Sequence, residues 1–462
     1  MALGRGVSKV VVLGMGKVTG RAVVEALIES DVEVHVSELH ETDDTRSLAE
    51  QFVDKGVAVS FGEPDLSLLE WADLIVPSPG VPPSNPLLMH ATRAGVPIWS
   101  EIELGWRFRQ GPMLAVTGTN GKTTVATLLG SMLETGGFPA VVAGNIGIPL
   151  IEAARSAQPG WALVCETSSF QLQFIESFHP SIAIVMNVAA DHYDWHGDYE
   201  NYLKAKGRIT EFQGPDDLLI VKADDPGCIR IATSSRASLW GFGLDHPSKV
   251  RARLEHGTGR EALGAAGVVG DKLVVESKVR TIEVISRGDI RLRGAHNTEN
   301  VLASTLAAFG YGVDIQAVRH AVASFEGLPH RSVEVAIVNG VKYVDDSKAT
   351  NPHATLHALE DLQDVVLIAG GQSRGLDLST LKQAESKLKA LITMGETAQE
   401  FVSLFDQVRS FEASNIEDAV DIAYSVAEPG DTVLLSPGCS SLDQYSSYAE
   451  RGMRFCKAVL SL

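Results

Sequence analysis

The chain has 462 residues, of which 45% are hydrophobic and 21% charged, and its formal net charge is -19. This composition is that of a globular α/β protein, and the length calls for several domains of roughly 150 residues each. The acidic balance argues against nucleic-acid or anionic-membrane partners, which require clustered Lys and Arg. The sequence has neither signal-peptide features nor an apolar stretch of about 18 residues, so we expect a cytoplasmic protein. Its four scattered cysteines form no C-x-x-C pair and are expected to be reduced.

Residues 1–100 alternate short apolar runs with amphipathic segments, a pattern typical of a parallel sheet covered by helices. We predict strands at 9–13, 32–36 and 74–76 and helical segments at 19–29 and 48–55.

A second α/β series begins at 113–117, where a strand leads into a Gly-rich loop and a helix at 122–134. It continues with strands at 161–166 and 182–187. From 212 to 290, short β-like runs separated by Gly, Asp and Ser predict an antiparallel or irregular insertion. Its predicted runs are 218–221, 273–275 and 290–292.

A third series predicts strands at 341–345, 365–369, 388–394 and 432–436, with helices between them. We therefore predict three α/β domains. They are a Rossmann-like N-terminal domain (1–100), a central P-loop ATPase-type domain with a β-rich insertion (101–327) and a Rossmann-like C-terminal domain (328–462).

The strongest motif follows the strand at 113–117. A strand, a Gly-rich turn and a helix N-terminus together surround phosphates with backbone N–H groups, while a lysine supplies positive charge and a threonine reaches Mg²⁺. The loop lacks the first Gly of the full G-x-x-x-x-G-K-[ST] pattern, since Val116 stands there, so it is a shortened variant. We predict nucleotide binding by Gly118, Thr119, Asn120, Gly121, Lys122, Thr123 and Thr124.

A weaker glycine motif, Gly14-Met15-Gly16-Lys17-Val18-Thr19-Gly20, follows the first strand. It resembles a dinucleotide fingerprint, but its last glycine lies one residue too far along. NAD binding, with Glu38 or Asp31 on the ribose, another diphosphate-bearing ligand and a purely structural turn all stay open.

Several polar residues follow predicted central strands. Glu166 ends one strand at the edge where parallel sheets bind ligands, which predicts a metal-holding carboxylate. His192 follows another strand, beside Asp191. Its spacing from His196 would allow zinc, whereas the surrounding aspartates and Gly197 favour Mg²⁺ or substrate.

Lys206 lies in a basic segment that, from the residues alone, is interpreted most simply as a solvated helix face. By contrast, residues 345–352 place two acids, a lysine and small polar side chains on one loop, a density that favours function.

Two longer segments carry a family resemblance. Residues 166–172 read E-T-S-S-F-Q-L, and residues 435–445 read L-S-P-G-C-S-S-L-D-Q-Y. Together with the phosphate loop they resemble the Mur ligases, ATP-dependent cytoplasmic enzymes that extend the peptidoglycan peptide, and within that family the D-glutamate-adding members. The likeness covers nearly the whole chain apart from 213–290. The D-N-P-R motif of the diaminopimelate- or lysine-adding members is missing.

The resemblance implies a monomeric enzyme that joins D-glutamate to UDP-N-acetylmuramoyl-L-alanine through an acyl phosphate. It uses ATP, two Mg²⁺ ions and a CO₂-derived carbamate on Lys206, and it needs no nucleic acid or membrane. It implies catalytic roles for Lys122, Glu166, His192, Lys206 and Lys348, and ATP contacts at Asn297, Arg331 and Asp346. The nucleotide sugar would contact Gly14, Gly16, Thr19, Gly80 and Asn145; D-glutamate would contact His192, Lys348, Thr350, Arg374, Ser441 and Tyr448; and the metals would be held by Thr123, Glu166, His192 and carbamylated Lys206.

One departure concerns Arg374, which stands where relatives carry lysine in a G-G-x-x-K segment; arginine keeps the charge and can bind a carboxylate through two nitrogens.

Two other interpretations of the function compete with a Mur ligase. One is a nucleotide-gated binding protein, which would not need the cations Arg331, Lys348 and Arg374. The other is a folylpolyglutamate synthase, which the segments at 166–172 and 435–445 disfavour.

Overall fold

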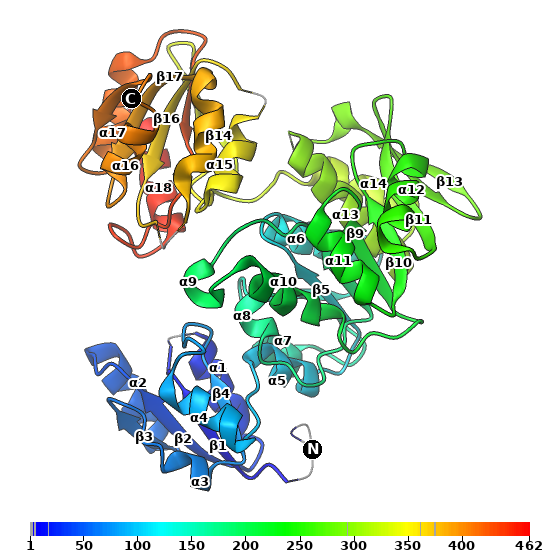
Figure 1. Ribbon diagram of the computed structural model, residues 1–462, viewed down its shortest axis with the longest axis vertical. Coiled ribbons are helices and arrows are strands. Elements are labelled where there is room, and N and C mark those ends of the chain that lie inside the picture. Colours follow the sequence, from blue (N-terminus) through cyan, green and yellow to red (C-terminus); the bar gives the residue numbers. More distant parts are fainter. Residues whose placement is uncertain (1–2, 4–5, 17, 293, 361, 374–375) are drawn as a thin grey trace. The chain divides into compact units, whose positions relative to one another are not determined.

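The computed structural model describes residues 3, 6–16, 18–292, 294–360, 362–373 and 376–462. They form three sheets in two compact units (Figure 1). The first unit, which contains two sheets, comprises Met1–Val188, Glu200–Ile290 and Asn297–Phe325; the second comprises Ala189–Tyr199, Arg291–His296 and Glu326–Leu462. No helix in the described ranges combines the length and apolarity that a membrane crossing requires.

The first sheet has the order β3-β2-β1-β4, and all its strands are parallel, as predicted. Helix α2 begins at Asp43, earlier than predicted, because Thr42 and Thr45 exchange side-chain and backbone hydrogen bonds in a capping box. The strands are β1 (Lys9–Leu13), β2 (Glu33–Glu38), β3 (Ala58–Phe61) and β4 (Leu74–Pro77), and the helices are α1 (Thr19–Ile28), α2 (Asp43–Val53), α3 (Leu68–Trp71) and α4 (Pro86–Ala94).

The second sheet has nine strands in the order β13-β12-β11-β10-β9-β8-β5-β7-β6. Strand β5, which leads into the phosphate loop, lies inside the sheet between β7 and β8 and is buried along its length. The strands are β5 (Met113–Thr117), β6 (Ala140–Gly144), β7 (Ala162–Glu166), β8 (Ile182–Val185), β9 (Leu218–Lys222), β10 (Ser238–Phe242), β11 (Ala262–Val269), β12 (Lys272–Ser277) and β13 (Thr281–Ser286).

Between residues 101 and 325 the helices are α5 (Glu101–Phe108), α6 (Lys122–Thr135), α7 (Leu150–Ser156), α8 (Ser169–Leu172), α9 (Tyr193–His196), α10 (Tyr199–Gly207), α11 (Pro226–Ser234), α12 (Pro247–Thr258), α13 (Ala295–Tyr311) and α14 (Ile315–Ser324), with 3-10 turns η1 (Arg208–Thr210) and η2 (Arg287–Asp289). Of these, α9 belongs to the second unit.

Residues 212–290 extend this sheet, and the prediction of an antiparallel or irregular segment is wrong for their first half. Strand β10 pairs in parallel with both β9 and β11, because helices α11 and α12 provide the crossovers that parallel strands need. Antiparallel pairing is confined to the end of the segment, where β12 pairs with both β11 and β13. No strand forms at 290–292, where Ile290 instead is the C-cap residue that follows the turn η2.

The third sheet has the order β14-β15-β19-β16-β17-β18, parallel except for the β14–β15 hairpin. The four predicted strands are confirmed. The two edge strands were not predicted: β18 is short, and β14, although it carries an apolar run at 335–338, has no fully buried residue. The strands are β14 (Val333–Val338), β15 (Val341–Asp345), β16 (Val365–Gly370), β17 (Leu388–Met394), β18 (Arg409–Glu412) and β19 (Thr432–Leu435), and the helices are α15 (Pro352–Leu359), η3 (Leu378–Lys387), α16 (Ala398–Leu404), α17 (Ile416–Val426) and α18 (Tyr448–Val459).

Candidate active site

The phosphate loop joins the end of β5 to the start of α6. Gly121 has φ of +85°, a conformation that favours glycine, and a Cβ there would lie 2.5 Å from the Asn300 side-chain oxygen, which would have to move. Asn187, after β8, fixes the loop: its carbonyl accepts from Thr119 N (3.0 Å) and its Oδ1 from Asn120 N (2.8 Å). The loop is therefore shaped before any anion arrives at the helix N-terminus.

Two lysines meet at one carbonyl of this loop. Lys122 Nζ donates to the oxygens of Gly118 (2.8 Å) and Thr119 (2.9 Å), and Lys206 Nζ donates to the same Gly118 oxygen (2.8 Å). Lys206 is only 2% exposed, so the interpretation of a solvated helix face is wrong. Two ammonium groups that share one acceptor repel each other. An anionic phosphate, or an anionic modification of one lysine, would relieve that repulsion.

Glu166 ends β7 directly beside β5, where it is paired in register with Val116. Its Oε1 accepts from Asn145 Nδ2 (3.0 Å). Its buried Oε2 has no hydrogen-bond partner among the described residues. Because a buried, unpaired carboxylate oxygen is costly, this atom fits a cation ligand such as Mg²⁺.

The E-T-S-S-F-Q-L segment is held by a second buried carboxylate. Ser168 and Gln171 form a capping box that starts α8, and Gln171 Nε2 lies 3.5 Å from Glu101 Oε2. Glu101 Oε1 accepts from Ile151 N (2.7 Å) at the start of α7. Burial raises the pKa of Glu101 to about 7, against the opposing effect of these hydrogen bonds. Much of the segment therefore positions the loop that follows Glu166.

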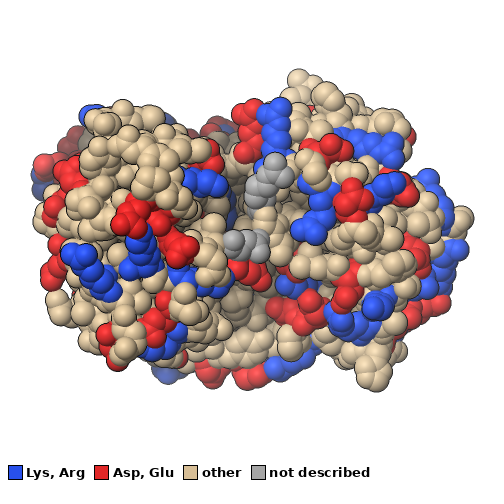
Figure 2. Space-filling model, turned by 90° about the horizontal axis from the view of Figure 1, so that it is seen from above, with Lys and Arg blue, Asp and Glu red and all other residues tan. Residues whose placement is uncertain are grey.

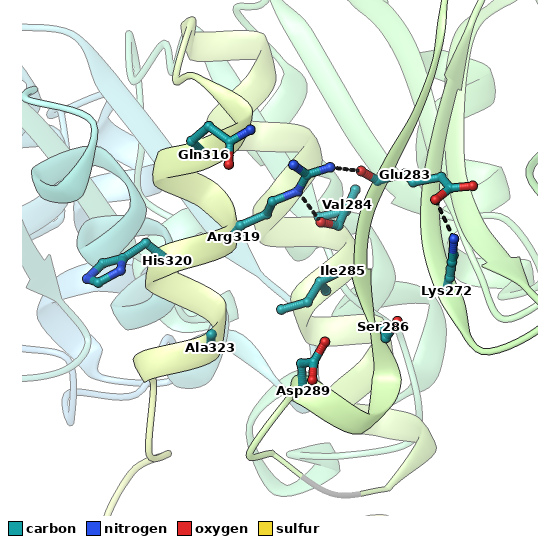
Figure 3. A pocket seen from close by; sticks show the side chains of 10 residues that line it. All are labelled: Lys272, Glu283, Val284, Ile285, Ser286, Asp289, Gln316, Arg319, His320 and Ala323. Atoms are coloured by element: carbon teal, nitrogen blue, oxygen red, sulfur yellow. Dashed lines mark hydrogen bonds and ion pairs between the residues drawn. The ribbon is translucent and has the colours of Figure 1, made fainter.

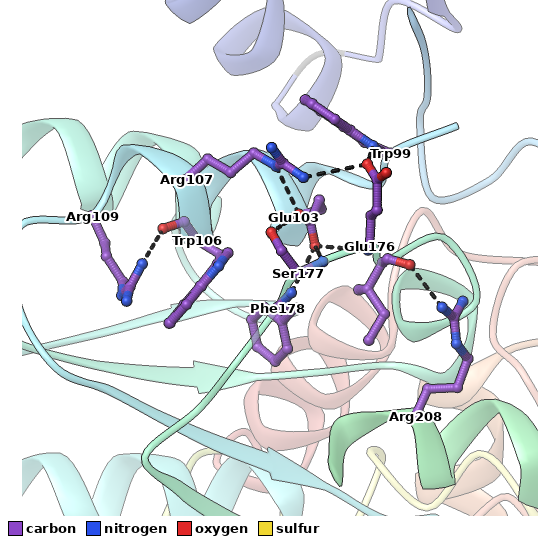
Figure 4. A network of polar contacts seen from close by, with 10 residues as sticks. Trp99, Glu103, Trp106, Arg107, Arg109, Glu176, Ser177, Phe178 and Arg208 are labelled. Carbon is purple, nitrogen blue, oxygen red and sulfur yellow. Dashed lines mark hydrogen bonds and ion pairs between the residues drawn. The ribbon is translucent and has the colours of Figure 1, made fainter. Parts of the chain in front are cut away.

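Figure 4 shows a neighbouring network around Glu103, also on α5. The fully buried Glu103 carboxylate accepts from three consecutive backbone N–H groups at 176–178, from the Ser177 hydroxyl, and from Arg107 Nε (2.7 Å). Arg208 reaches the chain just after α8 and donates to the carbonyls of Leu172, Gln173 and Ile175. Sequence reasoning missed this support, since buried and surface carboxylates look alike in a helix sequence.

In the first sheet, the Gly14 loop is closed by its own chain. Gly14 has φ of +81°, and the Ser78 hydroxyl donates to its carbonyl oxygen (2.6 Å). Glu38 Oε2 accepts from Met15 N (2.6 Å), so the carboxylate considered for a ribose is already used by the loop. Of the residues expected to meet the nucleotide sugar, Gly14, Gly16, Thr19 and Gly80 follow the carboxyl ends of β1 and β4, whereas Asn145 follows β6.

In the second unit, a cavity of about 280 Å³ collects most of the residues expected to bind D-glutamate. His192, Thr350, Ser441 and Tyr448 line it, although they are far apart in sequence. Lys348 Nζ lies 3.7 Å from the centre of the Tyr448 ring, a cation–π contact. Arg374 lies outside the described residues. The remaining lining residues are Asp191, Leu376, Ser440, Leu442, Ser446 and Ser447.

His192 adopts a left-handed backbone conformation with φ of +54°, which is uncommon for a residue other than glycine. Its backbone N–H donates to Asp191 Oδ1 (3.0 Å), and its ring Nε2 lies 3.6 Å from Asp191 Oδ2. Asn351 Nδ2 lies 3.4 Å from the same carboxylate. Strained residues of this kind cluster at functional sites, which fits a site role for His192.

Arg451, on α18, contacts the loops that carry several of the cavity residues. Its guanidinium is fully buried and donates to Ser347 Oγ (3.0 Å) and to the carbonyls of Ser347 (3.0 Å) and Cys439 (3.3 Å), with a longer contact to Gly370 O (3.5 Å). Burial lowers its pKa to about 10. One cation thus joins the end of β16 to the loops that follow β15 and β19, and nothing in the sequence signalled that role.

Arg331, an expected ATP contact, lies between two strained residues that two aspartates hold. His330 (φ +62°) and Ser332 (φ +52°) are both left-handed. His330 Nδ1 bonds Asp345 Oδ2 (2.6 Å), and Ser332 N donates to Asp346 Oδ1 (3.0 Å). Burial raises the pKa of Asp346 to about 7, although Ser436 and Arg331 favour its charged form.

Asn297, the remaining expected ATP contact, is buried on α13 in the first unit. Its side-chain oxygen accepts from Asn300 Nδ2 (3.1 Å), and the Asn300 oxygen faces Gly121 of the phosphate loop. The structure therefore brings Asn297 near the loop through Asn300.

Two other cavities contain none of the predicted site residues. One, of about 770 Å³, lies between β13 and α14 (Figure 3), where Arg319 donates to the carbonyls of Glu283 and Val284 and Lys272 pairs with Glu283. The other, of about 610 Å³, is lined by α10 and α11. On the face seen in Figure 2, acidic and basic side chains are intermixed, without a continuous basic surface.

Comparison with known proteins assigns the class. The MurD-like N-terminal domain of Mur ligases matches residues 8–100, the Mur ligase middle domain matches 116–308, and the Mur ligase glutamate ligase domain matches 330–439. The chain belongs to the Mur ligase family, whose members are ATP-dependent amide-bond-forming ligases. The family expected from the sequence is thereby confirmed.

Within that family the chain is similar to proteins named UDP-N-acetylmuramoylalanine–D-glutamate ligase. The protein from Desulfatibacillum aliphaticivorans is 39% identical and that from Natranaerobius thermophilus 35%, each alignment covering 98% of both chains. Among solved structures, a pseudomurein peptide ligase type C from Methanothermus fervidus has a TM-score of 0.61 at 18% identity (98% of this chain, 99% of that chain). The MurF ligase from Thermotoga maritima in complex with ADP has a TM-score of 0.58 at 15% identity (93% and 95%). These structures support the fold.

Proposed function

We propose that this chain catalyses the ATP-dependent addition of D-glutamate to UDP-N-acetylmuramoyl-L-alanine, in cytoplasmic peptidoglycan precursor synthesis. The observation that carries the amino-acid assignment is the cavity of the second unit. Its volume of about 280 Å³ is below the roughly 300–1,000 Å³ of pockets for drug-sized ligands, which suits one amino acid. Its polar lining of His192, Thr350 and Ser441 suits a zwitterion with a second carboxylate.

The chemistry begins with a carboxylate, which is a poor electrophile. In the proposed reaction, the L-alanyl carboxylate attacks the γ-phosphorus of ATP and ADP leaves, giving an acyl phosphate. The D-glutamate amine then attacks the carbonyl carbon, a proton is lost, and the tetrahedral intermediate expels inorganic phosphate to leave the amide. Charge develops on phosphate oxygens in both steps, so fixed cations and N–H donors lower the barrier.

Different residues are proposed to bind ATP, the transferred phosphate and the UDP substrate. The N–H groups of the phosphate loop and Lys122 bind the ATP phosphates, and Asn297, Arg331 and Asp346 contact the nucleotide. Lys348, stacked on Tyr448, neutralises the phosphate transferred next to the amino acid. Gly14, Gly16, Thr19, Gly80 and Asn145 are proposed to bind the UDP substrate.

Mg²⁺ would neutralise the phosphates when bound, and the unpartnered Glu166 oxygen supports a cation there. Thr123, His192 and a carbamate on Lys206 are the other proposed ligands for two such ions. A plain ammonium would repel Mg²⁺, whereas a carbamate offers an anionic oxygen. The crowding of Lys122 and Lys206 at one carbonyl supports this modification.

The test is phosphate release from ATP and Mg²⁺ with UDP-N-acetylmuramoyl-L-alanine and a panel of D- and L-amino acids. We expect release that requires D-glutamate, with L-glutamate as the matched stereochemical control. Release that is independent of D-glutamate, or that favours another amino acid, would contradict the assignment. Activity with a folate acceptor in place of the nucleotide sugar would instead support the folylpolyglutamate synthase alternative.

A further inference from the structure

Three side chains of metal-binding type converge in the second unit outside the proposed catalytic set. His330 lies just before β14, Asp345 ends β15, and Cys456 lies on α18. One ligand atom from each lies within 4.8 Å of the other two. In the described part of the chain, no other group of three or more His, Cys, Asp or Glu side chains meets this criterion.

The Asp345 carboxylate fixes the cluster. Its Oδ2 is shared by His330 Nδ1 (2.6 Å) and Cys456 Sγ (3.2 Å), and its Oδ1 accepts from Ser347 N (3.0 Å). The His330 ring packs against Gly452, where a Cβ would lie 2.2 Å from Nδ1. The end of β15 therefore holds Asp345, and helix α18 holds Cys456. The same helix presents Gly452, which has no side chain, to the His330 ring.

The donor set suits a thiophilic divalent cation. Zinc binds Cys sulfur at about 2.3 Å, His nitrogen at about 2.0–2.1 Å and carboxylate oxygen at about 2.0–2.2 Å, in tetrahedral geometry. Those bond lengths place the ligand atoms roughly 3.2–3.7 Å apart, so the 2.6 Å contact between His330 and Asp345 must open by about 1 Å or less. Mg²⁺ prefers oxygen ligands and would not compete well for a thiolate.

We propose that His330, Asp345 and Cys456 form a site for a thiophilic divalent cation such as Zn²⁺, and that its occupancy weakens ATP binding. On binding, the Cys456 thiol releases its proton to solvent, and His330 ligates through Nδ1 while keeping its proton on Nε2. Asp345 supplies one oxygen, and a water completes the tetrahedron.

The coupling to ATP follows from the chain path and rests on the proposed function. His330 immediately precedes Arg331, the expected ATP contact, and Ser332 on the other side is held by Asp346. A shift of His330 toward a metal changes the backbone at Arg331, because Ser332, on the far side of Arg331, is held by Asp346. The two flanking residues already have strained, left-handed backbones, which leaves few ways to absorb the shift elsewhere.

Binding is tested on the full chain with Co²⁺ as a spectroscopic substitute for Zn²⁺. We expect about one Co²⁺ per chain, with tetrahedral d–d bands and a thiolate charge-transfer band that Zn²⁺ abolishes. Cys456→Ser and Cys456→Ala should remove the charge-transfer band and weaken Zn²⁺ binding by at least about 10–100-fold. Cys228→Ser, at another cysteine, should leave both unchanged. Absence of the band in the unmodified chain, or its persistence in both Cys456 variants, would overturn the site.

The coupling is tested by kinetics at saturating Mg²⁺. Zn²⁺ should raise the KM for ATP severalfold in the unmodified enzyme, reversibly on chelation, and leave the KM for D-glutamate unchanged. Cys456→Ser should be insensitive at the same Zn²⁺ concentration. Equal inhibition of both enzymes would place the zinc effect at the Mg²⁺ ligands and overturn the coupling. Failure of the ligase assignment would not affect the spectroscopic result, so the two failures are distinguishable.

Discussion

The phosphate loop of the first unit and the cavity of the second unit hold their lysines in different ways. Lys122 and Lys206 both donate to one carbonyl of the loop, so like charges are brought together. Lys348 instead lies over the face of Tyr448, in a cation–π contact with that ring. An anion bound at the loop would screen two lysine charges, whereas an anion bound at the cavity would meet one. This difference predicts that substitutions in the two regions will affect different kinetic constants.

The largest effect is expected at Lys206. Lys206→Ala should lower kcat by about 10³-fold or more, because the proposed carbamate oxygen and its metal are both lost. A small carboxylic acid, such as formate or acetate, should restore part of the D-glutamate-dependent phosphate release. Lys204→Ala, on the same helix and lining a different cavity, is the matched control and should keep near-normal activity. Full activity of Lys206→Ala, or no response to added carboxylate, would remove the support for a carbamate.

A smaller effect is expected at Tyr448. Tyr448→Ala should raise the KM for D-glutamate by about 30–100-fold, since it removes a wall of the cavity and the ring that positions Lys348. Tyr448→Phe keeps the ring and should raise it by no more than about threefold. In both variants the KM for ATP, measured in the same coupled assay, should stay near normal. A parallel rise in both constants would show that the two regions do not act separately.

The smallest effect is expected at Glu101, which supports the segment after Glu166. Burial raises its pKa to about 7 in the folded chain, so it binds a proton more tightly folded than unfolded. Its contribution to stability is therefore present at acidic pH and is lost as pH rises through about 7. Relative to Glu101→Gln, the unmodified chain should lose about 2 kcal/mol of unfolding free energy between pH 5.5 and 7. Urea unfolding at both pH values measures this, with Glu33→Gln, on β2, as the control; identical pH profiles would refute the assignment.

Much of the fold around the phosphate loop could be predicted from the sequence. The strand, glycine loop and helix around Lys122 form a local pattern, and the structure contains it with the expected bounds of β5 and the expected start of α6. The four cavity residues His192, Thr350, Ser441 and Tyr448 followed from the family resemblance, and their convergence depends on topology that local patterns do not reveal.

The parts that were missed depend on contacts distant in sequence. Residues 212–290 carry turn residues that suggest an irregular segment, but helices α11 and α12 turn them into a continuation of the central sheet. Glu103 and Arg451 belong to types that are usually exposed, and only the fold shows that each is buried among backbone groups. Burial of Lys206 was missed from the residues alone for the same reason.

The Arg451 guanidinium also bears on how a small molecule could bind the cavity. By joining the loops after β15 and β19, it removes much of the freedom those loops would otherwise lose when a ligand orders them. A ligand that fits the cavity would therefore bind more tightly, because less free energy is lost in ordering the loops. A designed inhibitor of this pocket should accordingly favour a rigid skeleton that matches walls already in place.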